Sequence, residues 1–392
     1  MASTLNLKKT LKENTMFIAL IAVMLLFQIL IVATDHGSLF APANITNIIN
    51  QNSYVLILAT GMLLCILTGG NIDLSVGSIV CLVGAIAGTL ICNLHCNIYL
   101  SILFCLITGT LIGAWHGLWI AFVHIPPFIV TLSGMLLWRG VALIVLNGLT
   151  ISPFPDNYLN LFSSYIPGEA EAETVFAITM VIALICCAIM IATQALSRIS
   201  KIKKGYEQPS IVSFIIKMAL TTAIILVIAS LLGKHKGLPV ILILIAVIVA
   251  CYTYYTENTV PGRYLYAIGG NAKAAQLSGV NTDNVMFFAY TNMGFLSAVA
   301  ALVCVARFNS AAPTAGNSYE MDAIGSCFIG GASAYGGTGT VKGAVICAIF
   351  MGVLNNGMSI LGVDSNWQKA VKGLVLLLAV IFDVVSKRRK SK

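Results

Sequence analysis

The sequence carries very little charge for its length. Only 9% of its 392 residues are Asp, Glu, Lys or Arg, whereas 58% are hydrophobic. Soluble domains carry roughly 25% charged residues, so this chain cannot cover a water-facing surface of its own size. Its mean hydropathy is +0.94, and several apolar runs approach the ~20 residues that a spanning helix needs. The chain is therefore predicted to be an all-α polytopic membrane protein.

A nucleotide-binding motif is also missing. A phosphate-binding loop reads G-x4-G-K-[ST], and no such stretch occurs in the chain. The nearest approach is GGTGTVKG at Gly336–Gly343, in which Lys342 is followed by glycine rather than Ser or Thr. If ATP drives this protein, a separate subunit must hydrolyse it.

Side-chain clusters for metal binding or catalysis are equally scarce. Most of the 11 cysteines lie in apolar runs, where Cys behaves as a small hydrophobic residue. Cys92 and Cys96 flank His95, but no C-x-x-C pair occurs, so we expect no metal site. Paired carboxylates, a His cluster and a nucleophile–base pair are missing too, which disfavours an intramembrane enzyme. We expect no cofactor.

The net charge of +8 follows membrane topology rather than nucleic-acid binding. Basic residues cluster at Lys8–Lys12, Arg198–Lys204 and Lys387–Lys392, which predicts that both termini and the middle loop are cytoplasmic. The loop Leu149–Glu173 is acidic and lacks basic residues, so it is expected outside. No small-residue cleavage site follows the first apolar run, Met16–Ala33, so we expect an uncleaved first helix.

Termini on the same side of the membrane require an even number of crossings. About twelve apolar segments are present, and two of them resemble half-helices, so about ten transmembrane helices are expected. Thr34–Gln51, which contains Pro42, is expected to be an external loop. The apolar segments from which these spans are expected lie near residues 16–33, 53–68, 76–93, 98–123, 128–147, 174–196, 214–232, 238–255, 285–305, 344–361 and 370–385.

Two glycine-rich stretches interrupt the apolar pattern. GGNIDLSVGS at Gly69–Ser78 places Asn71, Asp73 and Ser75 inside apolar surroundings, and a second stretch covers Gly330–Gly343. Such backbone at membrane depth is tolerated only when it is buried in protein or lines a cavity, so we expect broken or re-entrant helices at 69–78 and 330–343. The two stretches fit equivalent parts of an internal repeat. They fit equally well the recurrence of Gly in close-packed membrane helices.

The stretch Gly262–Asn284 is the most distinctive polar segment. Asn271 is a good N-cap for a short helix over Ala272–Ser278, and Gly279 is the residue type that ends helices in the left-handed conformation. Gly269 and Gly270 are expected to form a flexible turn before this helix. A helix of two turns, roughly 10 Å long, cannot cross a bilayer. Its shape fits a docking helix, and it also fits an ordinary capped loop.

Four stretches in order resemble one protein family. YAIGGNAKAAQLSGVN resembles the cytoplasmic coupling loop of bacterial ABC sugar-importer permeases of the ribose/xylose/galactose group. GGNIDLSVGS, PPFIVTLSGMLLWRG, and IGGASAYGGTGTVKGA with NNGMS further along, resemble the same group. The resemblance runs from about residue 45 to the C-terminus and is strongest to xylose and multiple-monosaccharide permeases.

The resemblance implies one permease domain over residues 1–392, with residues 262–284 as a coupling loop within it. Its implied partners are a cytoplasmic ATPase, an extracytoplasmic sugar-binding protein, a second permease copy and the lipid of the inner membrane. Its implied activity is alternating-access import of a xylose-like pentose or a related hexose. The residues that would contact the ATPase are Gly269, Gly270, Asn271, Lys273, Ala274, Ala275, Ser278 and Gly279.

Polar residues within or beside the spans are candidates for the translocation pathway. Asp73 is a costly charge in an apolar run, which marks a functional candidate, but it also fits a helix cap. The asparagines fit contacts to sugar hydroxyls and also fit interhelical hydrogen bonds. The candidate residues are Asn71, Asp73, Ser75, Arg139, Asn147, Asn355 and Asn356.

Other interpretations of the sequence remain open. An ion-coupled secondary sugar transporter would use Asp73 and Arg139 as its coupling core. A branched-chain amino-acid ABC permease would share the architecture. Trp138, Trp367 and Tyr54 fit sugar stacking, although anchoring at the membrane interface is the commoner use of such residues.

Overall fold

The computed structural model describes residues 15–206 and 210–390. The basic residues Lys8, Lys9 and Lys12 and the last two residues lie outside the described part. Its helices are α2 (Thr15–Ala33), α3 (Pro42–Leu67), α4 (Val76–Gly88), the π-helical turn η1 (Thr89–Asn93), α5 (Ile98–Ala121), α6 (Pro127–Leu146), α7 (Asp156–Ser163), α8 (Ala172–Lys203), α9 (Ile211–Gly233), α10 (Val240–Asn258), α11 (Val260–Leu277), α12 (Thr282–Phe308), α13 (Tyr319–Ile329), α14 (Val341–Ile360) and α15 (Ser365–Lys390). Two short strands, β1 (Tyr165–Ile166) and β2 (Leu238–Pro239), pair antiparallel.

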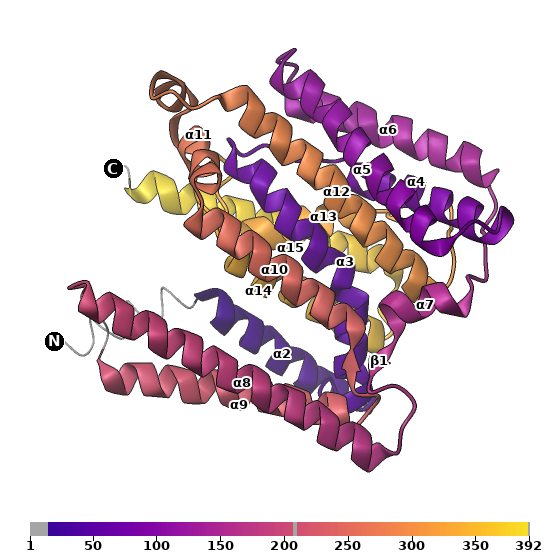
Figure 1. Cartoon of the computed structure of the whole chain (residues 1–392), viewed down its shortest axis with the longest axis vertical. Coiled ribbons are helices and arrows are strands. Elements are labelled where there is room, and N and C mark those ends of the chain that lie inside the picture. Colours follow the sequence, from indigo (N-terminus) through magenta and orange to yellow (C-terminus); the bar gives the residue numbers. More distant parts are fainter. Residues whose placement is uncertain (1–14, 207–209, 391–392) are drawn as a thin grey trace.

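The predicted polytopic helical fold is confirmed. Within the described ranges, ten helices are long and apolar enough to cross a membrane. Helices α2 and α15 have their outer ends on the same side of the bundle (Figure 1), as an even number of crossings requires. This side also carries the basic C-terminal end of α8 and all of α11, and we call it the basic end.

Two expected boundaries are wrong. The segment Thr34–Gln51 is not a loop throughout, because α3 begins at Pro42. Proline lacks the N–H that the first turn of a helix leaves unpaired, so Pro42 starts this helix instead of breaking it. The expected basic loop Arg198–Lys204 is mostly the last turns of α8, which continues to Lys203.

Helix α3 lies at the centre of the bundle and is buried along most of its length (Figure 1). Its neighbour α12 packs closely on α5 through small residues. A Cβ added to Gly109 or Gly113 of α5, or to Gly294 of α12, would overlap the backbone of the facing helix. Such close backbone approach is the usual way membrane helices associate, because lipid offers no hydrophobic drive between them.

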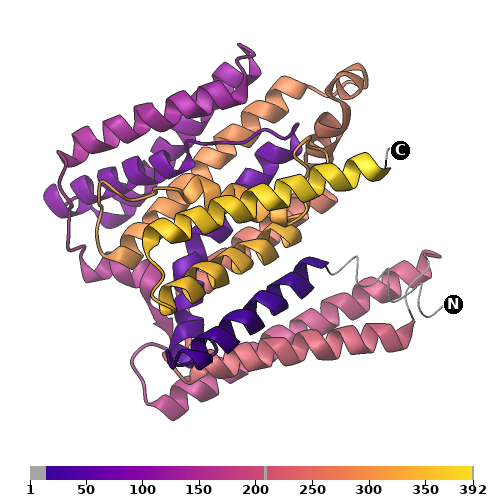
Figure 2. The same ribbon diagram turned by 180° about the vertical axis from the view of Figure 1, so that it is seen from behind.

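The hairpin of α8 and α9 lies apart from this core, beside α2 (Figure 2).

Both predicted helix breaks are confirmed. Helix α3 ends at Leu67, and residues 68–75 are non-helical before α4 begins at Val76. Helix α13 has 11 residues, about half a membrane crossing at 1.5 Å per residue. Residues 330–340 then form a non-helical connection to α14. Helices α4 and α14 therefore both begin after an irregular segment.

Candidate functional site

The predicted capped helix is present at the basic end. Asn271 is non-helical, with φ −162° and ψ 98°, and it divides α11 into two helical parts. Its side-chain Oδ1 accepts a hydrogen bond from the backbone N–H of Ala274 at 3.0 Å, which is an N-cap. Gly279 follows the helix with φ +86°, the left-handed conformation that glycine adopts without strain. Cap and terminator are both where the sequence predicts them. We call residues 272–277 the coupling helix, after the role that the sequence resemblance implies for them.

The face that the coupling helix presents differs from the expected one. Ala275 is 6% exposed and packs inward, so it cannot contact a partner directly. Lys273, Ala274 and Gln276 are exposed, and Leu277 is 80% exposed. Leu277 belongs to α11, which is not among the ten helices that are long and apolar enough to cross a membrane. This side chain is a signal that the sequence pattern did not single out.

The expected flexible turn at Gly269 and Gly270 is wrong. Both residues belong to the helical first part of α11. Gly269 is needed for close contact instead, because a Cβ there would overlap the carbonyl oxygen of Leu67 and the backbone nitrogen of Gly337. At Gly270 a Cβ would meet nothing within 4 Å.

Three backbone segments meet at Gly269, and we call their contact the glycine junction. It joins α11 to residues 67–70, where α3 ends and the first irregular segment begins, and to residues 334–337 of the second irregular segment. A Cβ on Gly70 would overlap the carbonyl of Ala334, and one on Gly336 would approach the Gly69 backbone at 2.5 Å. The backbone N–H of Gly337 donates to Leu67 O at 3.0 Å. This hydrogen bond pairs a backbone group that has no partner within a helix, as backbone at membrane depth requires.

Side chains reinforce the connection between α11 and the second irregular segment. The Tyr266 hydroxyl donates to the Gly339 carbonyl at 3.1 Å. Burial raises the pKa of Tyr266, so the hydroxyl keeps its proton as a donor. Lys342 at the start of α14 pairs with Glu257 at the end of α10 at 3.0 Å, in an exposed position. Tyr266 therefore ties α11 to the second irregular segment, whereas the Lys342–Glu257 pair joins α14 to α10.

Asp73 lies at the start of α4 and is fully buried. Its Oδ1 accepts from the Ser75 backbone N–H at 2.8 Å and from the Ser75 hydroxyl at 2.5 Å. The Ser75 hydroxyl lies 3.4 Å from His116 Nδ1, and Trp138 Nε1 donates to His116 Nε2 at 3.0 Å. This chain of contacts links α4, α5 and α6. His116 was missed in the sequence, although a histidine inside an apolar run is the kind of signal that could have identified it.

The remaining pathway candidates are dispersed. Arg139 donates to the carbonyls of Pro313 at 3.2 Å and Ala315 at 2.5 Å, so it fastens the loop after α12. Asn147 is exposed and ends α6 in the left-handed conformation, with φ 52°. Asn71 donates to Thr68 Oγ1 at 3.2 Å within the first irregular segment. Asn71, Asp73 and Ser75 share the first irregular segment, and Asn355 and Asn356 are adjacent in α14.

The two asparagines of α14 have different surroundings. Asn356 exchanges two amide hydrogen bonds of 2.9 Å with Asn44 of α3, which favours the interhelical role over a sugar contact. Asn355 is half-buried, and its Oδ1 has no hydrogen-bond partner among the described residues.

An ion pair inside the bundle was also missed in the sequence. Lys372 of α15 lies 3.0 Å from Asp322 of α13, and their side chains are 18% and 2% exposed. Tyr54 of α3 donates to Asp322 at 2.7 Å and stacks on Tyr319 with 3.8 Å between ring centroids. Tyr54 is therefore a core residue, whereas Trp367 is 70% exposed. Asp322 therefore holds α13 to both α3 and α15.

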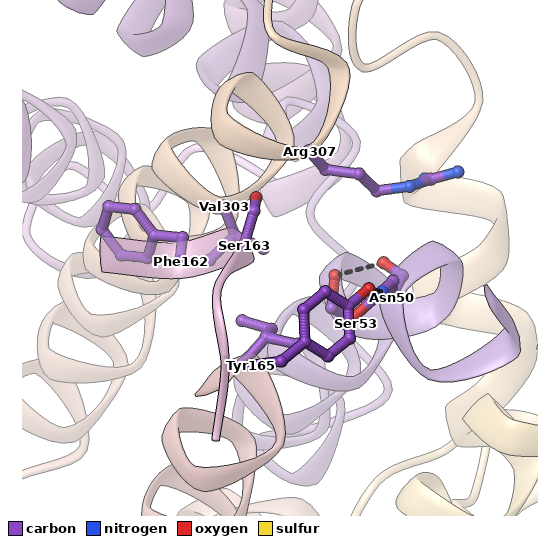
Figure 3. A pocket seen from close by; sticks show the side chains of 8 residues that line it. Asn50, Ser53, Phe162, Ser163, Tyr165, Val303 and Arg307 are labelled. Atoms are coloured by element: carbon purple, nitrogen blue, oxygen red, sulfur yellow. Dashed lines mark hydrogen bonds between the residues drawn. The ribbon is translucent and has the colours of Figure 1, made fainter. Parts of the chain in front are cut away.

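A small polar cavity opens at the other end of the bundle (Figure 3). It has a volume of about 150 Å³ and is lined by residues of α3, α7, β1, α10 and α12. Asn50 donates to the Tyr165 hydroxyl at 2.9 Å across it, and Ser53 donates to the Asn50 carbonyl at 2.8 Å. The Arg307 side chain extends past the rim.

Comparison with known proteins identifies the family. The family model described as the branched-chain amino acid transport system / permease component matches residues 44–186 and 171–380. The xylose transport system permease protein XylH of Escherichia coli strain K12 is 37% identical over 379 residues, covering 97% of this chain and 93% of that protein. The Haemophilus influenzae XylH is 35% identical over 373 residues, covering 95% of this chain and 97% of that protein.

A ribose permease shows the same extent of similarity. The ribose import permease protein RbsC of Haemophilus influenzae is 34% identical over 382 residues, covering 97% of this chain and 96% of that protein. No solved structure gives a significant match. The chain belongs to this family of transport-system permease components and is a multi-pass protein of the inner membrane.

Proposed function

We propose that this chain is the membrane-spanning subunit of an ATP-driven ABC importer of a monosaccharide, a xylose-like pentose or a related hexose. A separate ATPase subunit supplies the energy, because the sequence contains no phosphate-binding loop. The whole-length similarity to xylose and ribose permeases supports a sugar as substrate. The contacts of residues 269–277 support the route by which the ATPase would act on the permease.

The observation that carries this proposal is the coupling helix with its exposed end. It is capped at Asn271 and displays Leu277, 80% exposed, outside the spanning helices. Large apolar side chains at the centre of an interface commonly contribute most of its binding energy. Leu277 and Ala274 would dock against the ATPase, and Lys273 would lie at the rim.

The coupling route follows from the glycine junction. When the ATPase subunits close on ATP, they displace the coupling helix and the first part of α11. Because Gly269 touches both irregular segments, the displacement moves residues 67–70 and 334–337 together. Asn71, Asp73 and Ser75 follow directly after the first of these segments, so the pathway beside them opens to alternate sides.

Selectivity is then expected to lie mainly in the sugar-binding protein. A pathway that bound sugar tightly would slow its release, so weak contacts from side chains such as Asn71 suffice. The binding protein docks at the end opposite to the coupling helix, where the loop with Asp156 and Glu169 lies. Two copies of the chain serve two ATPase subunits.

The ion-coupled alternative has little support. It needs Asp73 and Arg139 to act as a pair, yet Arg139 donates to the backbone carbonyls of Pro313 and Ala315. The two salt bridges found among the described residues contain neither Asp73 nor Arg139. The amino-acid alternative rests on the family description, whereas the relatives at 34–37% identity are sugar permeases.

Reconstitution tests this proposal. The chain is placed in lipid vesicles with its co-expressed ATPase, and uptake of labelled xylose and ribose is measured with the binding protein. Uptake is expected only with ATP and all components present. Leu277→Ser should reduce co-purification with the ATPase by roughly ten-fold, the effect of a typical buried apolar anchor. Sugar uptake by the permease alone, driven by a proton or sodium gradient, would overturn it.

A further inference from the structure

A basic cavity lies between α8 and α9 at the basic end. It has a volume of about 460 Å³ and lies in the hairpin that stands apart from the core (Figure 2). Two groups of side chains line it, one on each helix. From α8 these are Thr193, Gln194, Ser197, Arg198 and Lys201, and from α9 they are Ser213, Phe214 and Lys217.

The charged side chains among the described lining residues are all positive. Arg198, Lys201 and Lys217 contribute three cations, and the described lining residues include no carboxylate. Arg198 lies over the Phe214 ring, 5.0 Å from its centroid, which directs the guanidinium toward α9. The other lining side chains are mostly hydroxyls and an amide, which can donate hydrogen bonds to the same anion.

Lys217 lies inside the apolar part of α9. It is in the second turn of the helix, beside Ile215 and Ile216, which are 58% and 62% exposed. The salt bridges found among the described residues do not include it. A cation close to hydrocarbon is costly unless a counter-charge or the polar headgroup layer is within reach. An anion in the cavity supplies that counter-charge.

Lipid is the anion source that the surroundings favour. Ile199 and Ile202 of α8 are 50% and 53% exposed beside the cavity, so acyl chains have apolar surface on both helices. Basic pockets between membrane helices on the cytoplasmic side suit the headgroups of anionic phospholipids. A soluble anion would gain the cations but not this apolar contact.

We propose that the cavity between α8 and α9 binds the phosphodiester headgroup of an anionic phospholipid, with Lys201 and Lys217 as its counter-charges. The bound lipid fills the space between the two helices and fixes the hairpin at the cytoplasmic surface. This inference rests on the membrane location of the chain and goes beyond its transport activity.

Native mass spectrometry of the purified full-length chain tests the proposal. The probes are cardiolipin and phosphatidylglycerol, with phosphatidylcholine as the neutral lipid and inorganic phosphate as the soluble anion. The double variant Lys201→Gln/Lys217→Gln removes two cations from the cavity. Lys234→Gln/Lys236→Gln is the matched control, because it removes two cations from the other end of the same hairpin.

Wild type and control are expected to retain anionic lipid in preference to phosphatidylcholine. The cavity variant should bind it about five-fold more weakly for each lysine removed, while its melting temperature in phosphatidylcholine stays near that of the control. Equal retention by both double variants would overturn the proposal. Retention of phosphatidylcholine as strong as that of the anionic lipids would also overturn it, because the lysines would then only extend to the membrane interface. The proposal would equally fail if inorganic phosphate bound to the cavity, or competed for it, as well as the lipids do.

Discussion

At the scale of single residues, the buried carboxylate of Asp73 has a structural and a functional interpretation. Its Oδ1 holds the Ser75 N–H and hydroxyl, whereas its buried Oδ2 has no partner in the described residues. The first observation fits a helix-start hydrogen bond, and the second leaves room for a role of the charge itself. A substitution that keeps the acceptor and removes the charge separates the two.

Asp73→Asn is expected to assemble normally and to lose little transport, because the amide oxygen still accepts from Ser75. Asp73→Leu removes the acceptor and should lower the free energy of unfolding by about 1–2 kcal/mol. Thermal unfolding of the purified variants, followed by vesicle uptake, measures both effects. An Asn variant that folds as wild type and does not transport would show that the charge is required.

At the scale of elements, the coupling helix offers a matched pair of neighbouring positions. Ala274 is exposed and Ala275 is 6% exposed. Ala274→Asp should leave the permease stable and weaken its association with the ATPase, because the new charge would be buried there without a partner. Ala275→Asp should destabilise the loop itself. Co-purification and melting temperature distinguish the outcomes, and the idea of a docking face fails if Ala274→Asp co-purifies as wild type.

The buried ion pair between α13 and α15 gives a second prediction at this scale. Lys372→Met leaves Asp322, 2% exposed, without its counter-charge. The free energy of unfolding should fall by about 3 kcal/mol. Adding Asp322→Asn should recover part of the loss, since the uncompensated charge is then gone. A double-mutant cycle in detergent checks this, and independent, additive effects of the two changes would contradict a direct pair.

The elements that the sequence predicted well are those decided by local chemistry. Asn271 and Gly279 define the coupling helix through contacts within a few residues, and the glycines of 69–78 and 330–343 break helices where they stand. The glycine junction joins residues far apart in the chain, so periodicity and capping rules could not reveal it. The prediction of a flexible turn at Gly269 is wrong because its sequence neighbours give no sign of the contacts with Leu67 and Gly337. Lys372 and Asp322 were overlooked for the same reason.

At the scale of the whole molecule, the distribution of charge predicts orientation. Residue 204 at the basic end should be cytoplasmic, and residue 160, which lies in α7 within the acidic segment 149–173, should be external. Lys204→Cys and Asn160→Cys, each on a background without the 11 native cysteines, are treated with an impermeant thiol reagent in intact cells. Labelling is expected at position 160 alone, and labelling at 204 with protection at 160 would reverse the topology.

The central claim for the whole molecule is that the coupling helix acts on the pathway through the glycine junction. Gly269 and Gly270 are adjacent in one helical segment, yet only at Gly269 would a Cβ collide with Leu67 at the end of α3 and with Gly337 of the second irregular segment. Alanine at these two positions therefore perturbs the junction in one variant and spares it in the other. Both positions precede Asn271, so neither substitution changes the exposed side chains of residues 272–277.

The most direct measurement is ATP turnover of the reconstituted complex with and without the sugar-loaded binding protein. Gly269→Ala is expected to retain its ATPase and basal turnover but to lose most of the stimulation by the binding protein. Gly270→Ala should behave as wild type. Full stimulation and full sugar uptake in Gly269→Ala, in a complex that assembles normally, would contradict transmission through the junction.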